Sequence, residues 1–212
     1  MNASSGVGMI DGCKTDFRCV TLSSAAPESL GVAVATVRSG GWGLIDCREG
    51  ASPPELVNHR FDELIRRTAG AIGLPGLALN LIDAVNESLL AQLATVEHVL
   101  LVQLPADAEL DACKHLVNCP QRVLLLQAPI TWNLQHCSGD SLVSVDQIDG
   151  WVVVGSELTR SDSDSSVFVV AQQALASTDR PVYAQGGFGP RATQAFRAMG
   201  CSGVILDEKT FS

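Results

Sequence analysis

The sequence predicts an α/β fold in which parallel strands and helices alternate and close into a compact (β/α)8 TIM barrel. The composition is aliphatic, with 46% hydrophobic and only 5% aromatic residues, which is typical of parallel sheets buried on both faces. Short apolar runs alternate with segments of helical periodicity along the chain. There are eight such runs, the number that closes this kind of barrel. A doubly wound open sheet is the alternative.

The predicted strands are short runs that are mostly apolar throughout rather than alternating. Continuous apolar character indicates strands that are covered by side chains on both faces. The runs cover residues 19–24, 42–47, 76–83, 98–104, 122–128, 150–157, 181–187 and 203–208.

Most of the connections have the spacing of amphipathic helices. The first places Leu30, Val34 and Val37 on one face and ends at Gly40 and Gly41, because glycine after the last periodic residue stops a helix. The second begins after a Pro-Pro pair. Further helices are expected after residue 86 and over 107–117, 167–177 and 191–199, whereas 129–149 is the least helical connection.

The chain is expected to form one domain. Residues 1–16 are polar and rich in Gly and Ser, which predicts a flexible tail, and the barrel then occupies residues 17–212. The sequence ends shortly after the eighth strand, so the barrel is expected to be incomplete at its last helix. This suggests an excised domain, or a partner segment that covers that side.

Charge and cysteine content exclude several classes of protein. The net charge of −9 disfavours nucleic-acid binding, and no apolar run is long enough to cross a membrane. The seven cysteines form no CxxC motif and the four histidines are scattered, so we expect buried thiols in a reducing cytoplasm and no metal site.

Polar residues end many of the apolar strands. In a (β/α)8 barrel the carboxyl ends of the strands carry the functional site, so these side chains are candidates to line a pocket there. Strand ends are also simply where chains become polar, and both interpretations stay open. Asp46 and Glu157 are a candidate general acid/base pair. The candidates are Ser23, Ser24, Asp46, Asn80, Asp83, Gln103, Gln127, Glu157, Gln185 and Asp207.

A glycine-rich turn follows the seventh strand. Gly186, Gly187 and Gly189 stand between this strand and a helix, where bare backbone N–H groups bind anions. The loops after strands seven and eight are the usual phosphate site of the fold. A tight strand-to-helix turn without a ligand uses glycine equally well.

Several segments resemble the flavin barrels of the nitronate monooxygenase family, including the enoylreductase type found in polyketide and polyunsaturated fatty acid synthases. The segment PVYAQGGFGPRATQAFRAMGCSGVILDEKTF is similar to the end of those barrels, ESLGVAVATVRSGGWGLIDC to their first helix and second strand, and GWVVVGSE to their sixth strand. None of these motifs is highly specific alone.

This resemblance implies FMN, with its phosphate on the backbone at Gly186 and Gly187 and near the loop after the eighth strand. Asn80 matches an asparagine position near the flavin, and Gln127 matches a polar flavin neighbour. The cofactor-binding residues implied in this way are Asn80, Gln127, Gly155, Glu157, Gln185, Gly186, Gly187, Gly189 and Asp207.

The sequence departs from the family pattern after Glu157. The family continues with Ala-Gly-Gly and a His or Arg, whereas this chain continues Leu-Thr-Arg-Ser-Asp-Ser-Asp, which adds negative charge beside an anionic cofactor. We therefore expect a divergent megasynthase domain with reduced or lost flavin chemistry and no assigned catalytic residue. The alternatives are an active FMN-dependent oxidoreductase, a non-catalytic scaffold or docking domain, and a phosphate-ester enzyme. Neighbouring synthase domains or an acyl carrier protein are the expected partners.

Overall fold

The computed structural model describes residues 17–24, 26, 29–48, 53–80, 87–103, 119, 122–127, 148–155 and 166–207. The predicted tail at residues 1–16 and the expected helix at 107–117 lie outside this part of the chain, as does the connection 129–149 except for its last two residues.

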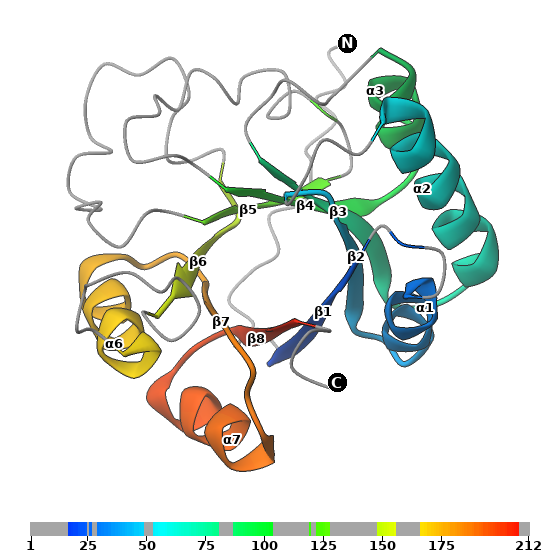
Figure 1. The fold of residues 1–212 in the computed structure, drawn as a ribbon. Coiled ribbons are helices and arrows are strands. Elements are labelled where there is room, and N and C mark those ends of the chain that lie inside the picture. The colour runs from blue at the N-terminus through cyan, green and yellow to red at the C-terminus, as the bar shows by residue number, and fades with distance from the viewer. Residues whose placement is uncertain are drawn as a thin grey trace, which may run out of the picture.

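The predicted barrel is confirmed. Eight parallel strands pair in chain order, and β1 pairs with β8, which closes the sheet (Figure 1). The register joins Leu22 to Leu44 between β1 and β2, and to Asp207 between β1 and β8. The strands are β1 (Arg18–Ser24), β2 (Trp42–Asp46), β3 (Leu74–Asn80), β4 (His98–Gln103), β5 (Arg122–Gln127), β6 (Gly150–Val154), β7 (Val182–Gln185) and β8 (Gly203–Asp207).

Helices surround the ring of strands on the outside (Figure 1). Their starts follow the sequence signals, since Pro54 and Pro190 each open a helix and Gly200 ends one with a φ of 105°. The helices are α1 (Leu30–Arg38), α2 (Pro54–Thr68), α3 (Glu87–Leu93), α6 (Val167–Ser177) and α7 (Pro190–Met199).

The inside of the barrel is filled with apolar side chains. Trp42 and Tyr183 meet near the amino ends of the strands, with ring centroids 5.7 Å apart, and the Arg18 guanidinium lies 5.7 Å from the Trp42 ring centroid. A Cβ on Gly203 would lie 2.8 Å from the Tyr183 ring, so glycine at this position makes room for the tyrosine. Polar side chains follow this apolar interior at the carboxyl ends of the strands.

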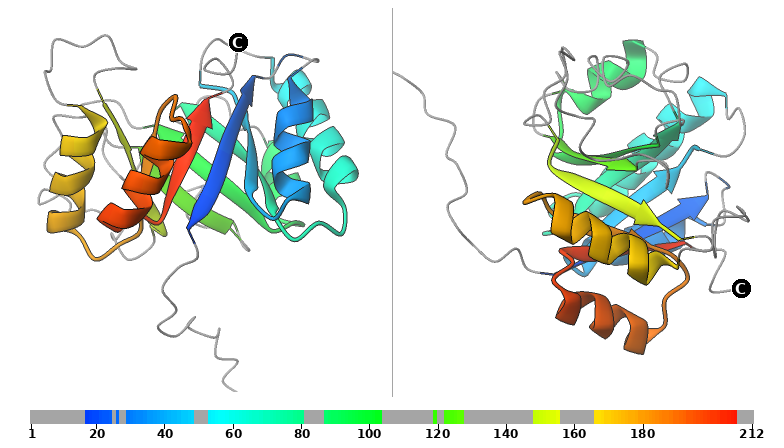
Figure 2. Two further views of the ribbon diagram at one scale, coloured as in Figure 1. Left: turned by 90° about the horizontal axis from the view of Figure 1, so that it is seen from below. Right: turned by 90° about the vertical axis from the view of Figure 1, so that its left-hand side faces the viewer.

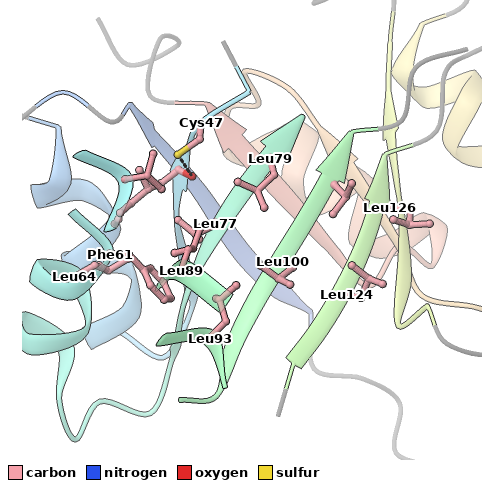
Figure 3. Packing of buried hydrophobic residues seen from close by; sticks show 14 of the residues in the cluster. Cys47, Phe61, Leu64, Leu77, Leu79, Leu89, Leu93, Leu100, Leu124 and Leu126 are labelled. Carbon is pink, nitrogen blue, oxygen red and sulfur yellow. Dashed lines mark hydrogen bonds between the residues drawn. The ribbon is translucent and has the colours of Figure 1, made fainter. Parts of the chain in front are cut away.

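A second apolar layer lies between the barrel and the helices. Phe61 and Leu64 of α2 and Leu93 of α3 pack against the outward-facing leucines of β3, β4 and β5 (Figure 3). On the neighbouring side, α1 lies so close to β2 that a Cβ on Gly43 would be 2.2 Å from a backbone oxygen of the helix. These contacts fix the strands whose ends form the candidate site.

The outer face of β8 and β1 is the side on which the sequence predicts a missing helix. Among the described residues these two strands lie side by side between α7 and α1 (Figure 2, left), where Phe196 of α7 packs with Val204 of β8 and Thr36 of α1 is hydrogen-bonded to Thr21 of β1. Within the same residues, no helix is long and apolar enough to cross a membrane.

Candidate functional site

A collar of polar side chains lies at the carboxyl end of the barrel. Successive residues of a strand point to opposite faces, so a residue two positions after an inward-facing one also points inward. The preceding inward residues all belong to the apolar cluster that fills the barrel. The collar consists of Asp46, Asn80, Gln103, Gln127, Gln185 and Asp207, and each of these residues was a candidate from the sequence.

Strand register brings several collar residues next to one another. Asn80 of β3 pairs with Gln103 of β4, and Gln103 pairs with Gln127 of β5. Gln185 reaches the next strand, because its Nε2 donates to Asp207 Oδ2 at 3.2 Å. The structure therefore brings these strand-end residues together at one end of the barrel, and their role in lining a ligand pocket stays a prediction.

The residue at the centre of the collar is Arg48, which sequence reasoning missed. Its Nε and Nη2 donate to the two carboxylate oxygens of Asp46 at 2.9 and 2.8 Å. Its Nη1 donates to Gln127 Oε1 at 2.6 Å and to Gln185 Oε1 at 3.2 Å. Nη2 also lies 3.9 Å from Asp207 Oδ1. One guanidinium therefore joins side chains from β2, β5, β7 and β8.

The backbone of Arg48 is held as firmly as its side chain. Its N–H donates to Asp46 Oδ1 at 3.1 Å, which makes a turn directly after β2. The Asn80 side-chain amide donates to the Arg48 carbonyl oxygen. Arg48 leaves only 8% of its side chain exposed, against 20% for Asp46 and 17% for Asp207. The signal in the sequence was the pair Asp46-x-Arg48, with the carboxylate on the last inward position of its strand.

The charges of this cluster favour a cation over an anion. Among the described side chains that meet here, two are carboxylates and one is a guanidinium, so negative charges outnumber positive ones. Two amide oxygens also accept hydrogen bonds from the guanidinium. Burial, and next the negative charge of Asp46, raise the pKa of the neighbouring Cys47 thiol to about 12. A thiol with such a pKa stays protonated at neutral pH and is a poor nucleophile.

The predicted phosphate cup differs from an open backbone cradle. The Gly186 N–H donates to Ile205 O at 3.0 Å, as part of the bonding between β7 and β8. A Cβ on Gly186 would lie 2.7 Å from the Phe188 ring, which packs in turn on Phe196 at a centroid distance of 4.6 Å. An aromatic ring therefore covers the glycine that was expected to face a phosphate.

The remaining predicted residues are spread around the barrel end. Gly187 and Gly189 are exposed, and Gly189 directly precedes α7. Gly155 is buried at the end of β6, while Glu157 lies outside the described residues, so its pairing with Asp46 stays a prediction. In the part of the chain that the structure describes, no group of three or more His, Cys, Asp or Glu side chains is arranged to hold a metal ion.

The residues present do not fit the FMN site implied by the resemblance. Gln127 and Gln185 direct their amide oxygens to Arg48, and the Gly186 N–H is bonded within the sheet. The Asp207 carboxylate ends β8, directly before the loop to which the resemblance assigns the phosphate, and it disfavours a second negative charge there.

Comparisons of the structure with solved structures agree with the barrel fold. The chain is similar to FabK from Thermotoga maritima, with a TM-score of 0.67 and 18% identity over 93% of this chain and 60% of that protein. It is also similar to nitroalkane oxidase from Streptomyces ansochromogenes, with a TM-score of 0.60 and 15% identity over 89% of this chain and 64% of the oxidase. The chain thus spans less than two thirds of the length of either protein.

Barrels with other chemistry are similar to a comparable degree. An HpcH/HpaI aldolase from Desulfitobacterium hafniense has a TM-score of 0.63 at 10% identity, over 93% of this chain and 88% of the aldolase. In comparisons by sequence, no protein-family model and no curated protein matches the chain. Identities this low show a shared fold, and fold alone does not assign an activity.

Proposed function

We propose that this chain is a (β/α)8 domain of nitronate monooxygenase and enoylreductase descent whose flavin chemistry is reduced or lost. The observation that carries the proposal is the position of Arg48. Its guanidinium binds Gln127 and Gln185, two of the side chains that the resemblance assigns to the cofactor. A ligand at these side chains would have to displace a largely buried cation and leave its acceptors unpaired, which is costly.

The glycine turn supports the same proposal. Anion cradles present several N–H groups that point at the ligand. The Gly186 N–H instead points at Ile205 O, and the Phe188 ring covers the Cα of this glycine. The turn then serves as a tight connection between β7 and α7.

A barrel without cofactor chemistry fits a non-catalytic role in a larger protein. We propose that the domain is a scaffold or docking piece of a polyketide or fatty acid synthase in the cytoplasm, with neighbouring synthase domains or an acyl carrier protein as partners. The likeness to FabK over 93% of this chain shows the shared barrel fold on which this proposal builds.

The second candidate is an active FMN-dependent oxidoreductase that acts on an enoyl thioester or a nitronate. The observation that favours it is the exposed pair Gly187 and Gly189 at the start of α7, because backbone N–H groups at a helix start attract phosphate.

An FMN-binding measurement decides between the two candidates. The purified chain is incubated with excess FMN, desalted and scanned for flavin absorbance, and binding is quantified by the quenching of FMN fluorescence. We expect no retained flavin and no saturable quenching. Stoichiometric retention of FMN would overturn the proposal and establish the second candidate.

Variants at Gly189 show where any FMN binds. No atom lies within 4 Å of a Cβ at this position, so Gly189→Ala and Gly189→Asp both fit, and they differ in charge. If the wild type binds FMN through this turn, Gly189→Asp weakens binding by at least tenfold while Gly189→Ala does not. Equal binding by both variants would rule out the predicted phosphate position.

A further inference from the structure

The acceptors around Arg48 are arranged to receive a planar guanidinium. The Asp46 carboxylate accepts two nearly equal hydrogen bonds, of 2.9 and 2.8 Å, from Nε and Nη2 on one edge of the forked Arg48 guanidinium. On the other edge, Gln127 and Gln185 both accept from Nη1. Two parallel bonds between arginine and a carboxylate are among the strong, directional contacts in proteins.

The acceptors hold one another in place. Gln185 bonds Asp207 through its Nε2, and this turns its Oε1 toward the guanidinium. Gln127 and Gln185 are 8% and 4% exposed, and each ends a strand of the closed barrel (Figure 1). Side chains fixed in this way on rigid elements form a binding site before the ligand arrives.

An ordinary ion pair on the surface of the same protein looks different. Arg67 on α2 lies 3.4 Å from Glu63, and 40% of its side chain is exposed. Such pairs contribute little, because both side chains remain hydrated. Arg48 instead has only 8% of its side chain exposed and is bound from several strands.

We infer that the collar, which forms the mouth of the barrel, is a guanidinium-binding site. Arg48 fills this site in the intact chain, and a free alkylguanidinium can bind there when the Arg48 side chain is removed. This inference and the proposed loss of flavin binding share one premise, which is that the Arg48 side chain lies in the mouth of the barrel. It assigns the site a ligand of opposite charge to the phosphate that the resemblance implies. Lysine is a poor substitute, because an ammonium lacks the planar fork.

Chemical rescue tests the inference. Arg48→Ala removes the fork and leaves Asp46 and Asp207 without their shared cation, so the melting temperature is expected to fall by about 5–10 °C. Methylguanidinium at millimolar concentration should restore part of that loss with a saturable dependence on concentration, because it binds the folded state. Potassium chloride at equal ionic strength should not.

Two proteins serve as controls for this rescue. The wild type should gain nothing from methylguanidinium, since its site is filled. Arg38→Ala also removes a guanidinium, which donates two hydrogen bonds to the Arg67 carbonyl oxygen. No ion pair joins Arg38 to a carboxylate among the described residues, so methylguanidinium should not rescue this variant. Equal rescue of Arg38→Ala, or no rescue of Arg48→Ala, would overturn the inference.

A second variant covers the case in which Arg48→Ala does not fold. Arg48→Lys keeps the charge and most of the stem but not the fork, and it should melt several degrees below the wild type. If Arg48→Lys is as stable as the wild type, the site does not select a guanidinium and the inference is wrong. No step of this test uses FMN, so its outcome is independent of the flavin-binding measurement.

Discussion

The change Asp46→Asn isolates the strongest contact of the barrel mouth. Asp46 accepts three hydrogen bonds from Arg48, at 2.8, 2.9 and 3.1 Å. An asparagine keeps one oxygen, which still accepts from Arg48 N and Nε. Its amide nitrogen, however, faces Nη2, so that two donors oppose each other. Among the described residues, the other carboxylate oxygen near Nη2 is Asp207 Oδ1, at 3.9 Å, which is too far for a hydrogen bond.

The expected loss follows from these contacts. Hydrogen bonds to a charged group contribute about 1.5–3 kcal/mol, and one such bond is lost while the pair also loses its charge attraction. Asp46 has 20% of its side chain exposed, so water screens only part of that attraction. We therefore expect the free energy of unfolding to fall by about 2–3 kcal/mol, and the melting temperature by about 4–12 °C.

Urea unfolding followed by circular dichroism measures this change. The matched control is Asp62→Asn on α2, because Asp62 accepts one exposed bond, from Gln92 at 3.3 Å. We expect that control to lie within about 0.5 kcal/mol of the wild type. If Asp46→Asn is no more destabilising than Asp62→Asn, Arg48 is not a structural cross-link of the mouth and the argument above fails.

Two further predictions concern packing and pH. Gly43→Ala should cost about 1–3 kcal/mol in urea unfolding, because its Cβ would lie 2.2 Å from a backbone oxygen of α1. Gly31→Ala on that helix meets nothing within 4 Å and should stabilise by up to about 1 kcal/mol; equal effects would contradict the close packing. Burial lowers the pKa of His98 below 6.5. A hydrogen bond to Val96 O raises this pKa in part, and the positive charge of Arg122 lowers it further. Below about pH 6.5 the unfolded chain therefore protonates His98 more readily than the folded chain, and the free energy of unfolding should fall as the pH drops. A His98→Leu variant whose free energy of unfolding depends on pH as steeply as that of the wild type would refute this.

The fold could be predicted from the sequence because each strand carries its own local signal. Runs such as residues 98–104 and 122–128 are apolar apart from their first residue and one glutamine near the end, and the structure places strands at His98–Gln103 and Arg122–Gln127. Closure needed only the count of such runs, since eight parallel strands with outer helices have one common closed arrangement. Boundaries were less accurate. β3 begins at Leu74 rather than at residue 76, because a strand tolerates Pro75 near its start.

The site was predicted only in part, for a physical reason. The alternation of side chains along a strand is a local property, and the end of a strand can be read from the sequence. Gln127 and Gln185 could therefore be assigned to the same end of the barrel before their contacts were known. The partner that joins them, Arg48, comes from a loop 79 residues from Gln127 and 137 residues from Gln185. The local signal is the carboxylate of Asp46 two residues earlier, and it indicates that the Arg48 side chain turns into the barrel only once Asp46 is known to point inward. The turn made by Asp46 decides that direction.

The collar supplies Arg48 with hydrogen-bond partners that the resemblance assigns to the flavin, and this supports the proposed loss of flavin binding. Polar groups that are buried at the end of a strand need partners, whether from a ligand or from the protein. Here Gln127, Gln185 and both carboxylates meet the donors of one guanidinium. A flavin that used Gln127 and Gln185 as hydrogen-bond partners would have to displace that guanidinium, so the hydrogen bonds that stabilise the collar oppose cofactor binding at these side chains. Arg48 therefore occupies the hydrogen-bonding positions that a flavin would use at Gln127 and Gln185, and its replacement tests the proposed loss of function directly.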